Sequence, residues 1–142
     1  MSKLIGITRN IPDSGILYLR HKGLKVKVWP YTHPPSEEQL ISFLTGCDGM
    51  ISMLSDQISK AFLEKLPALK IISNYAAGYN NIDLSYCAKQ KIKITNTPEV
   101  LTEATAELTL ALLLSVSRKI IPAYLNVQTN EWKSWNPTGF IG

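Results

Sequence analysis

Apolar and polar positions alternate along the first hundred residues in two kinds of segment. Short runs rich in Ile, Val and Leu predict five strands, at residues 3–8, 24–29, 49–54, 69–75 and 93–96. Between them, apolar residues recur with helical spacing and predict four helices, at residues 14–21, 37–44, 60–66 and 84–90. Several strands are apolar on both faces, which is typical of parallel sheets covered by helices. The pattern therefore predicts an α/β fold built on an open parallel sheet of the doubly wound type.

Short polar residues stand where two of these helices begin. Ser36 precedes Glu37, and Asp83 precedes Leu84. Side chains of this kind accept hydrogen bonds from the free N–H groups of the first helical turn. We therefore expect Ser36 and Asp83 to be N-caps.

A different pattern follows these elements. A long helix is predicted from a cap at Thr102 to about Ile120. Residues 108–114 are apolar on nearly every face, so this helix is expected to be buried on all sides. Pro122 is expected to end or kink it, and a shorter helix is predicted at residues 123–130.

A helix that is apolar on every side needs more covering elements than five strands and four small helices supply. The chain is therefore expected to be a fragment of a longer protein or half of a close oligomer. We predict a homodimer formed through residues 100–135, because exposed apolar surface of this size marks interfaces.

Composition narrows the class of protein. The 142 residues suffice for about one domain, and 45% hydrophobic with 18% charged residues is typical of a globular protein rather than a disordered one. The net charge is +4, but no three basic residues stand in a row. This distribution argues against nucleic-acid binding.

Cysteine usage and hydropathy predict a cytoplasmic protein. Cys47 and Cys87 stand 40 residues apart without a CxxC motif, so we expect buried free thiols and no metal site. The apolar stretch after Met1 is too short for a signal peptide. The most apolar region, residues 108–116, is too short to span a membrane.

No complete catalytic constellation is present. The chain contains neither GxGxxG nor GxxxxGK[ST], so no glycine-rich phosphate loop can be assigned. His21 and His33 are interpreted as solvated surface histidines.

Two loops at strand ends are better candidates, because ligands of open α/β sheets bind outside the carboxyl ends of the strands. They cover residues 54–57 and 76–83. Gly78, among small residues, would let backbone N–H groups approach an anion closely, so that a small carboxylate could bind without a charged side chain. The alternative is an ordinary strand-to-helix turn.

The same residues carry a family resemblance. Residues 72–83 (ISNYAAGYNNID) and 95–108 (TNTPEVLTEATAEL) resemble the D-isomer-specific 2-hydroxyacid dehydrogenases. Residues 131–137 (EWKSWNP) and 140–142 (FIG) are most similar to the glyoxylate/hydroxypyruvate reductase branch. The order and spacing of these motifs are kept along the chain.

The resemblance implies a two-domain oxidoreductase with a flavodoxin-like substrate domain and a Rossmann cofactor domain. Residues 1–99 would be the N-terminal part of the substrate-binding domain. Residues 100–142 would be connecting helices that lead into a cofactor domain missing from this chain. The parent enzyme would use NAD or NADP to reduce glyoxylate, hydroxypyruvate or a similar 2-oxoacid to the D-2-hydroxyacid.

The resemblance also implies substrate-binding residues, namely Leu54, Ser55, Ala76, Ala77 and Gly78. The amides of Ala77 and Gly78 would hold the substrate carboxylate, and Leu54 and Ser55 would line the pocket from the neighbouring loop.

Two further roles follow from the same resemblance. Thr105 would contact the cofactor near its nicotinamide, the alternative being packing at the helix start. Trp135 would reach into the neighbouring subunit's site, the alternative being a core or surface tryptophan.

The family's catalytic arginine, histidine and glutamate would lie beyond residue 142, so no catalytic residue is assigned here. The chain alone is expected not to turn over substrate. Another hypothesis is a stand-alone module that binds a small carboxylate or dimerises without catalysis. A receiver-type regulatory domain fits poorly, because Thr8, Arg9 and Asn10 stand where it would need acidic residues.

Overall fold

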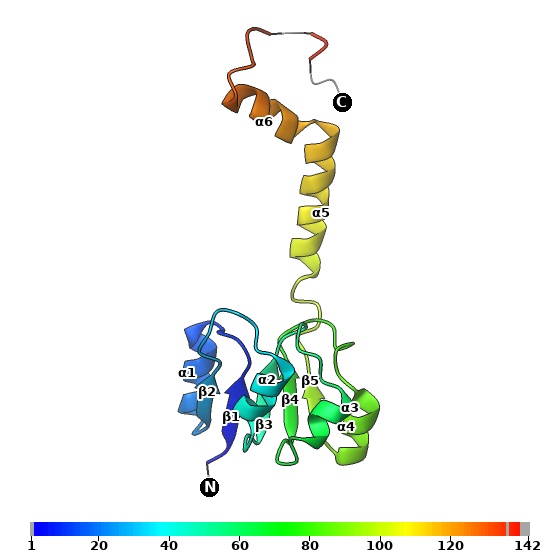
Figure 1. Cartoon of the computed structure of the whole chain (residues 1–142). Coiled ribbons are helices and arrows are strands. Elements are labelled where there is room, and N and C mark those ends of the chain that lie inside the picture. Colours follow the sequence, from blue (N-terminus) through cyan, green and yellow to red (C-terminus); the bar gives the residue numbers. More distant parts are fainter. Residues whose placement is uncertain (1, 136, 140–142) are drawn as a thin grey trace. The chain divides into compact units, whose positions relative to one another are not determined.

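Five parallel strands form one sheet in the order β2-β1-β3-β4-β5 (Figure 1). They are β1 (Leu4–Ile7), β2 (Lys25–Val28), β3 (Gly49–Ser52), β4 (Ile71–Asn74) and β5 (Lys93–Thr95). All five strands are where the sequence predicts them, each one to three residues shorter. The flavodoxin-like order and the parallel pairing confirm the predicted fold class.

The structure is a computed structural model that describes residues 2–135 and 137–139. It comprises two compact units, Met1–Glu99 and Val100–Gly142. The sheet belongs to the first unit. Asn136 and residues 140–142, which contribute to the family resemblance, lie outside the described residues.

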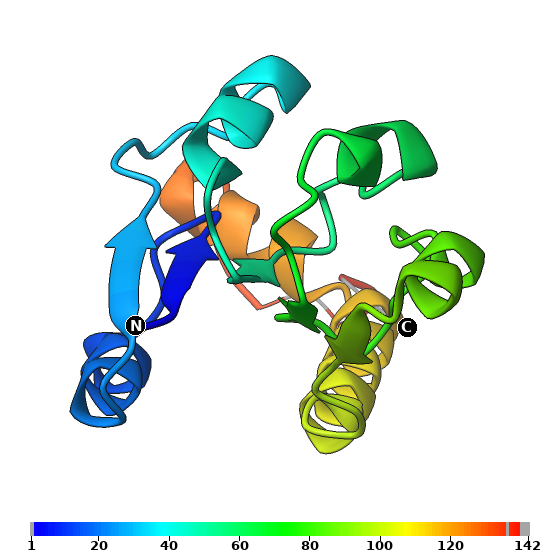
Figure 2. The ribbon, with the colours of Figure 1, turned by 90° about the horizontal axis from the view of Figure 1, so that it is seen from below.

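Helices cover both faces of the sheet. They are α1 (Asp13–His21), α2 (Glu37–Leu44), α3 (Lys60–Glu64) and α4 (Leu84–Gln90). Viewed along the strands, α2, α3 and α4 lie on one face of the sheet and α1 lies on the other (Figure 2). The limits of α2 and α4 match the prediction, whereas α1 begins one residue earlier and α3 ends two residues earlier.

Both predicted N-caps are confirmed. The Ser36 hydroxyl accepts a hydrogen bond from the Gln39 backbone N–H, and the Gln39 side chain accepts one from the Ser36 N–H, which together form a capping box. The Asp83 carboxylate accepts from the Tyr86 N–H at 2.9 Å. This bond and a second from the Ser85 hydroxyl lower the pKa of Asp83.

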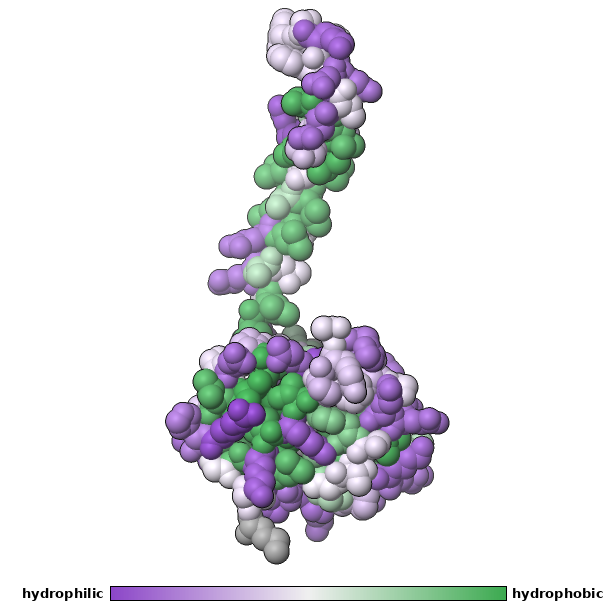
Figure 3. All heavy atoms as spheres, turned by 60° about the vertical axis from the view of Figure 1, so that its left-hand side comes forward, coloured by the Kyte–Doolittle hydropathy of each residue, from purple (hydrophilic) through white to green (hydrophobic). Residues whose placement is uncertain are grey.

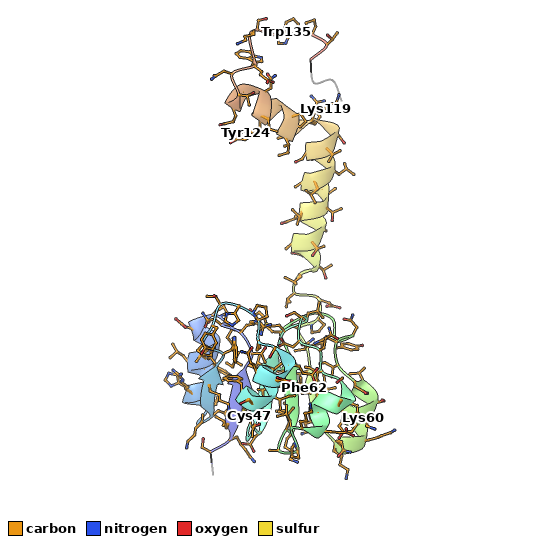
Figure 4. The ribbon with its side chains drawn as sticks, viewed as in Figure 1. Cys47, Lys60, Phe62, Lys119, Tyr124 and Trp135 are labelled. Atoms are coloured by element: carbon orange, nitrogen blue, oxygen red, sulfur yellow. The ribbon has the colours of Figure 1, made fainter. Side chains whose placement is uncertain are left out.

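Two apolar clusters form the core of the first unit. The larger lies between the sheet and α2, α3 and α4, and includes the fully buried Phe62 (Figure 4). The smaller lies under α1 and is built on Ile7, Ile11 and Ile16. Cys47 and Cys87 are buried in the larger cluster as free thiols, as predicted, and burial raises the pKa of both.

The second unit contains α5 (Thr102–Ser117) and α6 (Ile120–Gln128). The cap predicted at Thr102 is wrong, because the N-cap is Leu101 and no side chain caps this helix. The long helix also ends earlier than predicted, since Lys119 adopts a left-handed conformation (φ 51°) and α6 begins directly after it (Figure 4). Pro122 lies in the first turn of α6. The N–H groups of a first turn have no acceptor within the helix, so the missing N–H of proline breaks no hydrogen bond and Pro122 does not end the helix.

Nothing in the described part of the chain buries the long helix, so its burial stays a prediction that depends on elements outside this chain. No residue of α5 is buried, and five of its leucines are more than half exposed: Leu108, Leu110, Leu112, Leu113 and Leu114. A helix that is apolar on every face is buried only if other elements surround it, and the second unit supplies α6 alone. The apolar surface is visible along both helices in Figure 3.

No single described helix is long and apolar enough to cross a membrane. Taken together, α5 and α6 pass that test of length and composition, but they are bent by 62° at the break between them.

Candidate functional site

The site predicted from the sequence lies at the carboxyl ends of β3 and β4. Along the chain, β2 is added on one side of β1 and β3 on the other, so the switch point at which doubly wound sheets leave a crevice lies between β1 and β3. A Cβ atom added to Gly78 would lie 3.9 Å from Cδ1 of Leu54. The structure therefore brings the loop after β3 and the loop after β4 into contact.

A buried carboxylate holds the loop after β3. Asp56 is 4% exposed, and its Oδ2 accepts hydrogen bonds from the Thr8 hydroxyl and from the Met53 N–H. Its Oδ1 pairs with the Arg9 guanidinium at 3.2 Å. Because both oxygens have partners, the charge can be buried without an unpaired acceptor. Asp56 thereby ties this loop to the end of β1.

Asn74 is the centre of a second buried network, at the end of β4. Its side-chain oxygen accepts a hydrogen bond from the Ser52 hydroxyl at 2.8 Å. Its Nδ2 donates to the Asn81 side-chain oxygen at 3.0 Å and to the Gly78 carbonyl at 2.8 Å. One fully buried side chain thus connects β3, β4 and the loop after β4.

Asn81 joins the two loops directly. Its Nδ2 donates to the backbone carbonyls of Met53 at 3.2 Å and Asp56 at 2.8 Å. Among the residues that the structure describes, no buried side-chain nitrogen or oxygen lacks a partner. The loops are consequently held by a fully satisfied polar network, which favours one fixed arrangement.

In residues 76–78 the backbone carbonyl groups are hydrogen-bonded, whereas the backbone N–H groups have no partner among the described residues. Each carbonyl accepts a hydrogen bond: Ala76 O from Thr97 N (2.9 Å), Ala77 O from Asn96 Nδ2 (2.8 Å) and Gly78 O from Asn74 Nδ2 (2.8 Å). The three N–H groups donate to no group within the described part of the chain. Ala77 and Gly78 are also exposed. The loop therefore offers adjacent backbone donors to solvent or to an anion.

Gly78 is not required by the backbone conformation, because its φ is not positive. An added Cβ would meet the Asn80 side chain at 3.5 Å and Leu54 at 3.9 Å, which are ordinary contacts. Glycine at position 78 therefore matters for the space that it leaves for a ligand above the loop, and not for the backbone conformation.

Ser55, the other residue predicted to line the pocket, is exposed beside Leu54, which is 49% exposed. Thr105 lies in α5, where its carbonyl accepts a hydrogen bond from the Thr109 hydroxyl at 2.8 Å. Trp135 follows α6 and is 79% exposed (Figure 4). Thr105 and Trp135 belong to the second unit, and their proposed contacts with cofactor and neighbouring subunit stay predictions.

The structure adds residues that the sequence reasoning missed. Asp56 and Asn81 lie in the two candidate loops but had no role assigned, and Asn74 and Asn96 lie outside them. All four hold the loops through their hydrogen bonds. The sequence did contain a sign of the role of Asn74. This residue is the last of a strand whose buried face is otherwise apolar. A polar residue at such a position needs a buried partner.

The first unit also has an apolar hollow of about 540 Å³ against the sheet. Its lining includes Ile5 of β1, Leu19 of α1, Ile51 of β3, and Ile71 and Ser73 of β4. None of residues 54–57 or 76–78 lines this hollow. Within the described residues, no group of three or more His, Cys, Asp or Glu could hold a metal ion.

The loop between β1 and α1, residues 8–12, contains no glycine, and the sequence contains no GxGxxG motif.

The chain is similar to proteins of one family. A family model described as the catalytic domain of the D-isomer specific 2-hydroxyacid dehydrogenases matches residues 5–135. The glyoxylate reductase of Thermococcus onnurineus is 41% identical over the whole chain, which covers 43% of that protein. The glyoxylate reductase of Pyrococcus horikoshii is 40% identical with the same coverage.

Solved structures show the same similarity. The TT0316 protein of Thermus thermophilus superposes with a TM-score of 0.92 at 34% identity, over 98% of this chain and 44% of that one. A putative D-isomer specific 2-hydroxyacid dehydrogenase from Polaromonas has a TM-score of 0.89 at 25% identity, over 100% and 44% of the two chains. The chain thus spans less than half the length of these relatives.

Proposed function

The chain belongs to the D-isomer-specific 2-hydroxyacid dehydrogenase family, and from that premise we propose that it is the N-terminal, substrate-binding part of an NAD(P)H-dependent 2-oxoacid reductase. Residues 1–99 are proposed as the N-terminal part of the substrate-binding domain. Residues 100–142 are proposed as connecting helices that lead into a Rossmann cofactor domain. The boundary coincides with the division into two compact units.

One observation carries the proposal. The loop of residues 76–78 has all three carbonyls bonded to the protein, while its three N–H groups donate to nothing within the described residues. Adjacent backbone N–H groups without a protein partner can bind anions, and hydrogen bonds to a carboxylate are stronger than those between neutral groups. In our proposal the amides of Ala77 and Gly78 hold the carboxylate of a 2-oxoacid, with Ala76 beside them.

The neighbouring loop limits the size of the substrate. Leu54 lies against Gly78 and Ser55 follows it, so we propose that both line the pocket next to the carboxylate. A short substrate such as glyoxylate or hydroxypyruvate fits this assignment. The names of the similar proteins from Thermococcus and Pyrococcus, both glyoxylate reductases, support the same substrate class.

The redox chemistry belongs to the complete protein. NAD or NADP would deliver a hydride to the substrate carbonyl, and Thr105 would contact the cofactor. The residues described here do not hold a cofactor on their own. We therefore propose that this chain binds and orients the 2-oxoacid but does not reduce it.

The second unit is proposed to bind a second copy of the chain. The side chains of α5 and α6 expose a large apolar surface, and in the proposed dimer Trp135 extends towards the neighbouring subunit's site. Analytical ultracentrifugation at micromolar concentration tests this proposal. Leu112→Glu, which places a charge on the apolar surface, should shift the chain to monomer, and an unchanged dimer would contradict the proposed interface.

We place the protein in the cytoplasm, in keeping with its free cysteines.

Carboxylate binding is tested by NMR titration of the 142-residue chain with oxamate, a non-reactive analogue of a 2-oxoacid. The backbone amide signals of Ala77 and Gly78 should shift and saturate. Oxamide, which has the same skeleton without a carboxylate, is the matched control and should leave both signals in place. Equal responses to the two compounds, or oxamate shifts confined to other residues, would contradict the proposal.

A second experiment separates binding from catalysis. The chain is mixed with NADH or NADPH and hydroxypyruvate, and absorbance at the nicotinamide band is followed. We expect no consumption of the reduced cofactor. Turnover at the rate of a complete reductase would show that the catalytic groups lie within these residues after all.

A further inference from the structure

We infer that Asn96 is a positioning residue that orients the backbone N–H of Gly78 for the substrate carboxylate. The inference rests on the proposed function, because it concerns the same loop. The sequence assigns no role to Asn96, which comes directly after β5 and outside the loop itself.

The peptide bond between Ala77 and Gly78 is planar. The carbonyl of Ala77 and the N–H of Gly78 belong to one trans peptide group and point in opposite directions. The Asn96 Nδ2 donates to that carbonyl at 2.8 Å. A group that holds the carbonyl on one side therefore sets the direction of the Gly78 N–H on the other.

The preceding peptide is held by the next residue of the same segment. The Thr97 N–H donates to the Ala76 carbonyl at 2.9 Å, which sets the direction of the Ala77 N–H. Asn96 and Thr97 thus fix the two amides proposed to bind the carboxylate. The Thr97 bond comes from the backbone and survives a side-chain change, whereas the bond from Asn96 depends on its side chain.

Few side chains could take this role at position 96. The side chain must donate a hydrogen bond to a carbonyl and carry no negative charge, since an anion binds on the other side of the same peptide. Asparagine satisfies both conditions. Aspartate has the same shape but presents only acceptors when ionised, so it would repel the Ala77 carbonyl and release the peptide.

Four chains test the inference: the unchanged chain, Asn96→Ala, Asn96→Asp and the control Gln90→Ala, which changes an exposed amide side chain at the end of α4. Without ligand, the ¹⁵N heteronuclear NOE of Gly78 should fall in both Asn96 variants and not in the control. With oxamate, Asn96→Ala should weaken binding about fivefold, the ratio that corresponds to one ordinary net hydrogen bond. Asn96→Asp should weaken it further.

The pH dependence of Asn96→Asp is the signature that a merely structural role would not produce. Lowering the pH from about 7 to about 4.5 begins to protonate the new carboxyl, which can then donate to the Ala77 carbonyl. Oxamate affinity should rise in this variant as the pH falls and should stay nearly constant in the unchanged chain.

The outcomes separate the two proposals. If oxamate binds the unchanged chain at Ala77 and Gly78, but both Asn96 variants bind it equally well, the role of Asn96 is refuted and the proposed function stands. If oxamate fails to shift these amides in the unchanged chain, the proposed function and the inference both fail. If Asn96→Ala does not fold, Asn96→Asp and its pH dependence decide.

Discussion

Removing the Asn74 side chain should destabilise the first unit strongly. Asn74→Ala deletes three short hydrogen bonds, with the Ser52 hydroxyl, the Asn81 side-chain oxygen and the Gly78 carbonyl, and a fourth, long one from the Asn81 Nδ2 at 3.5 Å. An intramolecular hydrogen bond contributes a net amount of about 1 kcal/mol, which sums to roughly 3 kcal/mol for the three. Ser52 and Asn81 are buried, so their orphaned polar groups cannot easily be rehydrated.

Urea denaturation followed by tryptophan fluorescence measures this loss. Trp29 is 6% exposed in the first unit and reports its unfolding. Trp132 and Trp135 are 60% and 79% exposed in the second unit, so their emission should change little. The free energy of unfolding of Asn74→Ala should be lower by about 3 kcal/mol, whereas Asn80→Ala, at an exposed position, should change it by less than about 0.5 kcal/mol.

A double-mutant cycle tests the network rather than the single residue. Ser52→Ala removes one hydrogen bond and should cost about 1 kcal/mol. In the double variant Ser52→Ala/Asn74→Ala that bond is lost only once, so the combined cost should fall short of the sum by about 1 kcal/mol. A loss of less than about 1 kcal/mol for Asn74→Ala, or strict additivity of the two changes, would refute the argument from the buried network.

Three further outcomes follow from the packing and charges of the first unit. Gly49→Ala should cost about 1–3 kcal/mol in urea denaturation, because its methyl group would lie 2.8 Å from an isoleucine methyl on β4; an unchanged midpoint would contradict this tight packing. A hydrogen bond from Lys3 and a second from a backbone N–H lower the pKa of Asp48, so the folded chain has stability at neutral pH that is lost as the pH falls through that lowered value. Asp48→Asn should therefore lose less stability between about pH 7 and pH 3 than the unchanged chain, and equal losses would refute this linkage. Burial raises the pKa of Cys47 and Cys87, so a thiol reagent at neutral pH should label them only through unfolding, and fast labelling of the native chain would contradict their burial.

Local sequence was sufficient for most of the first unit. Apolar runs of strand length and helical spacing between them predicted the five strands and four helices, because these periods reflect which side chains a sheet or helix can bury. Ser36 and Asp83 were recognisable as caps because the bond they make spans only three residues. The loops at the carboxyl ends of β3 and β4 were candidates for the same reason, since the fold class alone determines where a ligand crevice lies.

The second unit shows where local patterns were insufficient. Hydropathy predicts that Leu108 and Leu110 need partners on all sides and that this chain supplies too few of them. Both residues are more than half exposed, and what covers them depends on their surroundings. Thr102 had the chemistry of a cap, but Leu101 occupies that position without a side-chain bond. Hydropathy and residue type describe what a segment can bury or bond, and not what lies beside it.

The polar groups of the candidate site were decided by tertiary structure. Asp56 accepts from Thr8, 48 residues away in the chain, and Asn81 donates to Met53, 28 residues away. Asn96 reaches a carbonyl 19 residues earlier. The sequence by itself determined which strands form, which loops follow them and that small residues stand in the loop of residues 76–78. Only the folded sheet, by bringing distant donors to those carbonyls, decided which way the N–H groups on the other side of each peptide point.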